Sequence, residues 1–358
     1  MMVRLFSSNE PIHAVGLDIG TSSIKVVQLR LEKEKIFLET YGEIALGPYA
    51  GLNVGQSIKL GDEKVIEAIG DLFKEAKITS KNAVLSISPL TTYVSLIKVP
   101  NVLDKDLVTM LPLEARKYVP VPVSEIQLDW WHIPNIDIRG EKDERMIYVV
   151  LAAVNNETLA EYSRYASKLA LVNPVFEIES FSLVRSLIHN DMKMTICVDL
   201  GAQITTVSLI NSGVVIDVHV IARGSQDSTI QLSRALAISV EVAEETKRTF
   251  GYLGDSSNPY VKEIMELSSY PLFGDISRLT LMYERKYNQN IEGIILTGGG
   301  ARVPGVIDMF KKSVTVPVRV AGPFDQVQVP LFLKEMIDRI GPTYSVAVGL
   351  ALKKLFDK

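Results

Sequence analysis

The sequence is poor in the features that mark secreted, membrane-spanning and nucleic-acid-binding proteins. Its 358 residues include one cysteine, Cys197, so no disulfide can form within the chain, and a reducing compartment is indicated. The net charge of −4 and the four histidines do not provide the clustered basic surface of a nucleic-acid-binding protein. The uncharged apolar stretch at residues 146–154 is about half as long as a bilayer span. We therefore expect a globular protein of a reducing compartment.

What the sequence does contain is enough apolar material for a sizeable core. Apolar residues make up 47% of the chain and charged residues 22%, as in ordinary globular proteins. A length of 358 residues allows two domains. Strand-like and helix-like segments occur together along most of that length, which indicates an α/β fold.

The most informative stretch lies close to the start of the chain. An apolar strand at residues 15–19 contains Asp18 and runs into Gly20, three hydroxyl residues and Lys25, before a second apolar run at 26–29. This layout predicts a hairpin. A glycine lets the backbone approach a ligand, successive N–H groups and hydroxyls can hold a phosphate, and Asp18 can hold a metal ion directly or through water. An ordinary hairpin with a solvated polar turn fits the same residues.

The same layout returns near the midpoint of the chain. Residues 196–207 again run from an apolar strand through Asp199 and Gly201 to a short polar turn, a hydroxyl residue and an apolar strand. A motif that recurs halfway along a chain indicates two domains of like topology. Two such domains can hold a ligand in the cleft between them.

Two further motifs follow in the second half. Glu244 and Lys247 are three residues apart on a predicted helix, so they share one face, where a solvated surface pair is the simplest interpretation. A buried strand at 294–297 is followed by three glycines, whose bare backbone lets a base or a phosphate lie against it. The final predicted helix, 345–351, has small residues on one face.

A block of different character interrupts the first half. From about residue 97 it contains a predicted helix that starts at Asp104 and includes Pro112, followed by strand-like runs at 127–133 and 145–154. This block indicates a small α+β insertion. Residues 255–290 are more polar and indicate a second, modest helical insertion.

Taken in order, the two Asp turns, the Glu-x-x-Lys helix, the triple-glycine turn and the small-residue final helix resemble the actin-like ATP-binding superfamily, which includes actin, Hsp70, sugar kinases and FtsA. The resemblance implies a two-domain α/β fold of duplicated βββαβαβα units with small inserted α+β subdomains. It also implies these boundaries: subdomain 1A at 1–96 and 150–190 with the C-terminal helix 343–358, a 1C-like subdomain at 97–149, subdomain 2A at 191–253 and 291–342, and subdomain 2B at 254–290.

The resemblance further implies a site for ATP and Mg²⁺. Asp18 and Asp199 would position the metal ion, largely through water. Glu177 or Glu179 would be the candidate catalytic residue that orients water. The implied nucleotide-binding residues are Asp18, Gly20, Thr21, Ser22, Lys25, Asp199, Gly201, Gln203, Thr205, Glu244, Lys247, Gly298, Gly299, Gly300 and Arg302.

Within the superfamily, the segment at 111–120 and the opening at 16–29 resemble the PilM family of type IV pilus assembly proteins. That resemblance implies a cytoplasmic ATP-binding scaffold at the inner face of the bacterial inner membrane. Such a scaffold binds the cytoplasmic N-terminal tail of a PilN-like membrane protein in a groove between 1A and 1C, and reaches PilO and PilP through it. Contact with the membrane would be made only through the partner.

Other members of the superfamily remain as alternatives. Hydrolytic relatives commonly have Gly-Gly-Thr in the second loop, whereas this chain has Gly201-Ala202-Gln203, so we expect ATP to be bound and any ATPase activity to be weak. An FtsA-like, self-associating filament protein usually ends in an amphipathic anchor helix, whereas residues 353–358 follow directly on the final small-residue helix. A GspL-like protein of type II secretion normally carries additional membrane and periplasmic parts. A sugar kinase would require an acceptor site with a catalytic base.

Overall fold

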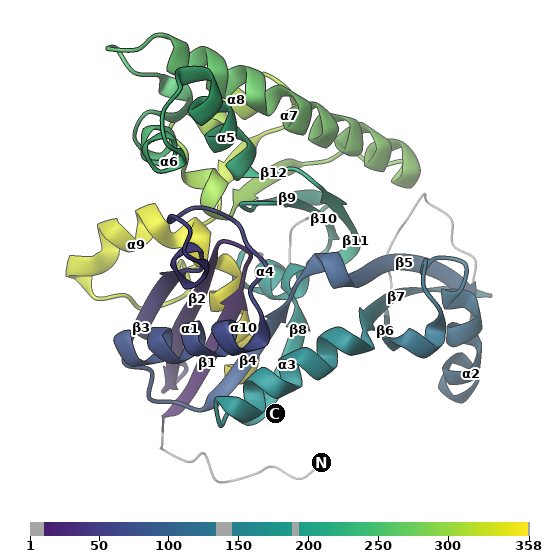
Figure 1. Ribbon diagram of the computed structural model, residues 1–358. Helices are drawn as coiled ribbons and strands as arrows, with labels where there is room; N and C mark the ends of the chain where they lie inside the picture. The colour runs from purple at the N-terminus through teal and green to yellow at the C-terminus, as the bar shows by residue number, and fades with distance from the viewer. Residues whose placement is uncertain (1–10, 134–144, 188–192, 357–358) are drawn as a thin grey trace.

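The structure, a computed structural model, describes residues 11–133, 145–187 and 193–356. Its strands form two sheets, with orders β3-β2-β1-β4-β8 and β13-β12-β9-β10-β11-β5-β7-β6. Each sheet carries helices on its faces, and the two halves lie one above the other in Figure 1. We call the half built on β1 the first lobe and the half built on β9 the second lobe.

The first lobe starts with the predicted hairpin, and a third strand follows it. Its strands are β1 (Ile12–Ile19), β2 (Ser23–Glu32), β3 (Lys35–Ala45), β4 (Asn82–Ile87) and β8 (Val172–Ile178). Its helices are α1 (Asp62–Glu75), α3 (Asn156–Lys168) and α4 (Glu179–Leu187). Val65, Ile69 and Leu72 recur at helical spacing on α1 and bury one face of that helix in the apolar core of the sheet.

The second lobe repeats this plan. Its strands are β9 (Thr195–Leu200), β10 (Thr205–Asn211), β11 (Val214–Ile221), β12 (Gly293–Thr297) and β13 (Val318–Val320). Its helices are α5 (Ser225–Leu236), α6 (Val240–Thr249), α7 (Tyr260–Tyr287) and α8 (Val306–Lys311). The order β11-β10-β9-β12-β13 matches β3-β2-β1-β4-β8 strand for strand. The predicted α/β fold of duplicated units is therefore confirmed.

The insertion contains β5 (Thr92–Pro100), α2 (Asp104–Ala115), β6 (Ile126–His132) and β7 (Met146–Asn155). It leaves the first lobe after β4 and returns at α3, but Ser95 of β5 pairs with Asp217 of β11, so its strands extend the second sheet. The boundaries predicted at 96/97 and 149/150 cut through β5 and β7. The inserted strands instead run over 92–100 and 146–155, because β5 and β7 pair with each other without interruption, from Thr92 opposite Val154 to Pro100 opposite Met146.

The segment predicted as subdomain 2B, 254–290, holds one long helix, α7. Val261, Phe273 and Ile276 of α7 share one apolar cluster with β9 and β12, so this helix covers the second sheet and has no separate core. Across the described ranges, no helix combines the length and the apolar character needed to cross a membrane.

The C-terminal helices are α9 (Lys334–Ile340) and α10 (Ser345–Phe356), and α10 connects the two lobes. A Cβ on Gly16 of β1 would lie 1.9 Å from the carbonyl oxygen of Ala347, and one on Gly349 would lie 1.7 Å from that of Ser182. The small residues therefore allow backbone contact between α10, β1 and α4. Another face of α10 packs in one apolar cluster with Cys197 of β9.

Candidate nucleotide-binding site

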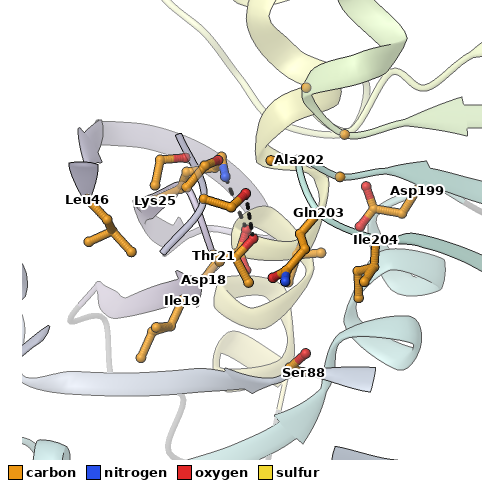
Figure 2. Close-up of a pocket in the computed structure, with 18 of the residues that line it drawn as sticks. Asp18, Ile19, Thr21, Lys25, Leu46, Ser88, Asp199, Ala202, Gln203 and Ile204 are labelled. Atoms are coloured by element: carbon orange, nitrogen blue, oxygen red, sulfur yellow. Dashed lines mark hydrogen bonds and ion pairs between the residues drawn. The ribbon is translucent and has the colours of Figure 1, made fainter. Parts of the chain in front are cut away.

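A cavity of about 630 Å³ lies where the two hairpin turns, the triple-glycine turn and the start of α10 meet. Figure 2 shows Asp18 and Lys25 on one side, Asp199 on the other and Gln203 between them. Most of the predicted site residues line it, namely Asp18, Gly20, Thr21, Ser22, Lys25, Glu179, Asp199, Gly201, Gln203, Glu244, Lys247, Gly298, Gly299 and Arg302. Residues that are far apart in the sequence thus form one concave surface.

The first turn holds its carboxylate in a defined polar environment. Lys25 Nζ lies 3.9 Å from Asp18 Oδ2, and Ser86 Oγ on the neighbouring strand donates to Asp18 Oδ1 at 3.2 Å. The Gly20 N–H closes the turn by donating to Ser23 O at 3.2 Å. Burial raises the pKa of Asp18, although Lys25 and Ser86 act in the opposite direction.

The second turn leaves its carboxylate less supported. Within the described residues, no side chain donates a hydrogen bond to Asp199, and Gly298 is so close that a Cβ there would lie 2.2 Å from Asp199 Oδ1. Burial and the negative charge of Asp18 raise the pKa of Asp199 to about 6, with Lys25 opposing them. Neighbouring carboxylates of this kind are stabilised by a cation between them.

Glu179, the first residue of α4, is the third carboxyl group in this wall. Burial, together with the charges of Asp18 and Asp199, raises its pKa well above the ordinary value. No set of three or more His, Cys, Asp or Glu side chains in the part of the chain that the structure describes is arranged to hold a metal ion. A Mg²⁺ ion here would therefore keep much of its water, as this ion commonly does.

Glu244 and Lys247 form a buried pair, so the interpretation as a solvated surface pair was wrong. Lys247 Nζ lies 2.7 Å from Glu244 Oε2, and Thr229 Oγ1 donates to the same oxygen at 2.6 Å. Burial opposes ionisation of Glu244, but Lys247, Thr229 and Arg248 outweigh it and hold its pKa below the ordinary value. Burial also lowers the pKa of Lys247. The pair gives the second-lobe wall a fixed polar edge.

Three predicted residues lie away from the cavity wall. The buried Thr205 donates through Oγ1 to Arg223 O at 2.9 Å, and Gly300 packs against Leu200 behind the glycine turn. The carboxylate of Glu177 is held by Arg185 at 2.6 and 2.8 Å and by Ser182. These placements correct the assignment of all three, and they leave Glu179 as the candidate of the two glutamates.

Several lining residues were not predicted. Glu43 accepts from Ser23 Oγ at 2.7 Å, and Thr206, next to Thr205, faces the cavity in its place. A loop of the first lobe also crosses towards the second lobe, since the Ser57 N–H donates to Gln226 Oε1 at 3.1 Å. A Cβ on Gly55 of this loop would lie 2.9 Å from Cγ of Glu244. The glycine-rich composition of the loop was visible in the sequence, but its destination was not.

Comparison with known sequences places the chain in a family. A family model described as type IV pilus assembly protein PilM matches residues 16–355. The cell division protein FtsA of Borreliella burgdorferi is 24% identical over 392 residues, covering 95% of this chain and 90% of that protein. FtsA of Pseudomonas aeruginosa is 22% identical over 383 residues, covering 94% and 88%.

Solved structures give the same result for the fold. The chain is similar to that of a PilM-PilN type IV pilus biogenesis complex, with a TM-score of 0.81, 23% identity and coverage of 97% of this chain and 99% of that one. It is also similar to EutJ from Carboxydothermus hydrogenoformans, with a TM-score of 0.55, 15% identity and coverage of 98% and 93%. A third similar structure is MreB5 of Spiroplasma citri bound to ADP, with a TM-score of 0.52, 12% identity and coverage of 95% of each chain. Because the family model spans nearly the whole chain, this actin-like protein belongs to the type IV pilus assembly protein PilM family.

Proposed function

We propose that this protein binds ATP with Mg²⁺ in the cleft between its lobes and acts as a cytoplasmic scaffold of the type IV pilus machine. The observation that carries the proposal is the convergence of two Asp turns and a glycine turn on one cavity. Backbone N–H groups of such turns bind phosphate oxygens, and paired carboxylates hold a hydrated Mg²⁺ between them.

The adenosine end of the nucleotide would contact the second lobe, and the phosphate end would contact both lobes. Glu244, Lys247 and Gly298 of the second lobe line the end assigned to the adenosine, and Arg302 lies beside them. Gly20, Thr21 and Lys25 of the first lobe and Gly201 and Gln203 of the second would enclose the phosphates. Charge-assisted hydrogen bonds from these groups favour a polyanion.

Slow hydrolysis is part of the proposal. Glu179 is the one of the two candidate glutamates that lines the cavity. Burial and the charges of Asp18 and Asp199 raise its pKa above the ordinary value, and a Mg²⁺ ion held by those two carboxylates would offset the part due to their charges. The second turn has Gly201-Ala202-Gln203 where hydrolytic relatives commonly have Gly-Gly-Thr, and phosphoryl transfer depends on exact positioning of the terminal phosphate. ATP would therefore act mainly as a bound ligand that sets the conformation of the two lobes.

The partner would be the cytoplasmic N-terminal tail of a PilN-like membrane protein. The similar solved chain comes from a PilM-PilN complex. The insertion exposes large apolar side chains on and around α2, namely Val102, Leu103, Val108, Leu113, Tyr118 and Val121. Exposed apolar side chains gathered on one small element are typical of protein-binding surfaces. The tail would bind in a groove between the insertion and the first lobe. It would thereby hold the protein at the inner face of the inner membrane and link it to PilO and PilP.

Two measurements test these two parts. Isothermal titration calorimetry with Mg²⁺ and ATP measures nucleotide binding by the full chain. A pull-down with a synthetic N-terminal tail of a PilN-like protein then measures partner binding with the nucleotide present. Val108→Asp should abolish capture, whereas Leu331→Asp, which changes another exposed apolar side chain outside the insertion, should not.

Absence of ATP binding would refute the first part, and equal capture by both variants would refute the surface assigned to the tail. Electron microscopy of the ATP-bound protein tests the FtsA-like alternative, since filaments would be visible directly.

A further inference from the structure

Tyr162 on α3 is a buried side chain with an unused polar group. The residue is 7% exposed, and its ring packs against Tyr165 and Phe176. Its hydroxyl has no hydrogen-bond partner among the residues that the structure describes, yet the side chain lines the cavity together with Asp18 and Glu179. By contrast, the hydroxyl of Tyr165 on the same helix donates to Glu161 and to Asp62.

The surroundings of Tyr162 keep its hydroxyl protonated. Burial and the negative charges of Glu179, Glu161 and Asp18 raise its pKa above the ordinary value. A buried phenol that stays protonated is a hydrogen-bond donor in need of an acceptor, and an anionic oxygen is the strongest acceptor. The cavity is where such an acceptor can bind.

The position of Tyr162 indicates which anion it meets. The adenosine end of the site is assigned to the second lobe, around Glu244 and Gly298. Tyr162 belongs to the first-lobe wall, which it lines together with Asp18 and Glu179. An ATP molecule that lies across the cleft directs the far end of its phosphate chain towards this wall.

We propose that the Tyr162 hydroxyl donates a hydrogen bond to the terminal phosphate of bound ATP, so that the cleft distinguishes ATP from ADP. This inference rests on the proposed nucleotide binding and adds the residue that reads the nucleotide state. Helix α3 follows directly on strand β7 of the insertion, and the side chain of Asn155 at that junction accepts the Glu157 N–H at 2.8 Å. A hydrogen bond from Tyr162 would therefore link the terminal phosphate to α3, the helix that follows the last strand of the insertion.

The test measures the preference of the full chain for a nonhydrolysable ATP analogue over ADP, each with Mg²⁺, by calorimetry. Tyr162→Phe keeps the ring and its packing and removes only the hydroxyl. We expect about tenfold weaker binding of the ATP analogue and unchanged binding of ADP, because a hydrogen bond to a charged group is lost only in the triphosphate complex. Tyr283→Phe is the matched control, since among the described residues its buried hydroxyl also has no partner and the residue is not part of the cavity wall.

Three results would overturn the inference. These are unchanged binding of the ATP analogue by Tyr162→Phe, equal weakening of the analogue and ADP, or the same change of preference in Tyr283→Phe. If the unmodified chain binds neither nucleotide, the proposed function fails and the inference fails with it. If the unmodified chain binds both and Tyr162→Phe does not differ, only the inference fails.

Discussion

The two hairpins that begin the two lobes have the same layout and different surroundings. Gly16 and Cys197 hold equivalent positions, two residues before the aspartate of each hairpin. Gly16 lies against the backbone of α10 with no room for a side chain, whereas the side chain of Cys197 is buried in the apolar cluster on another face of the same helix. The first hairpin therefore contacts α10 through its backbone, and the second packs against the same helix through side chains.

The aspartates of the two hairpins differ in their polar partners. Asp18 has Lys25 nearby and accepts from Ser86 on the adjacent strand β4. The equivalent neighbour of Asp199 is Thr297 on β12, but Thr297 Oγ1 donates to Pro342 O at 2.8 Å and contacts Ser345. The first turn is thus internally paired, while the carboxylate of the second has no side-chain donor among the described residues. Duplication preserved the backbone plan and left the polar partners free to diverge.

Substitutions at Gly16 and Cys197 should give the largest difference, which is one of stability. Gly16→Ala should destabilise the protein by about 4 kcal/mol or more, because its Cβ would overlap the backbone of α10. Cys197→Ala removes one buried sulfur and should cost about 1 kcal/mol without changing ATP affinity. Thermal unfolding measures both. A Gly16→Ala protein as stable as Cys197→Ala would contradict the close contact.

The carboxylates come next. Asp18→Asn and Asp199→Asn should each weaken the binding of Mg²⁺ and ATP by about 100-fold, roughly 2.7 kcal/mol, because each removes one of the charges assigned to the metal ion. Calorimetry measures the loss. Asp338→Asn, at an exposed aspartate of α9, serves as the control and should bind normally. Unchanged affinity in both cleft variants would show that the metal assignment is wrong.

In the absence of ligand, the same two variants should differ in stability. The pKa of Asp199 rises from 3.8 to about 6 on folding, so the folded state holds this proton more tightly and its contribution to stability is lost as pH rises from about 4 to about 6. Asp199→Asn removes this penalty and should stabilise the free protein by on the order of 2 kcal/mol near pH 7.5, with no gain near pH 4. Asp18→Asn also disturbs contacts with Ser86 and Lys25 and should gain less.

Unfolding in urea at both pH values measures this difference. Equal gains for the two variants, or a gain that persists at pH 4, would count against the unsupported environment of Asp199.

The smallest contrast concerns the neighbouring strands. Ser86→Ala and Thr297→Val should each cost about 1 kcal/mol of stability, since each removes a buried side-chain hydrogen bond. Only Ser86→Ala removes a partner of a carboxylate proposed to hold the metal ion, so only this variant should change the affinity for Mg²⁺ and ATP, by about threefold. Equal effects on affinity would remove the distinction between the two turns.

Local patterns in the sequence predicted a large part of this protein. The two Asp turns, the triple-glycine turn and the final small-residue helix are short motifs whose residues serve nearby backbone, and together they identified the fold and the family. They also predicted most of the cavity wall. Motifs of this kind are readable because turn geometry and close backbone contact restrict the residue types that can occupy them.

The errors within motifs arose from side-chain direction. Neighbouring residues of a strand point to opposite faces, so Thr206 lines the cavity and Thr205 does not. Glu177 and Glu179 are two apart, but the chain changes from β8 to α4 between them. Only the packing of Arg185 and Ser182 around Glu177 shows which carboxyl group is occupied elsewhere.

The sequence by itself determined the duplicated hairpins and the chemistry that each can carry. The tertiary structure alone decided that β5 joins the second sheet, that the loop at Gly55 reaches Glu244, and that Tyr162 lines the same cavity as Asp18 and Glu179. The physical reason is the distance along the chain. A turn is specified by adjacent residues, whereas these contacts form between segments that are brought together only when both lobes pack around α10.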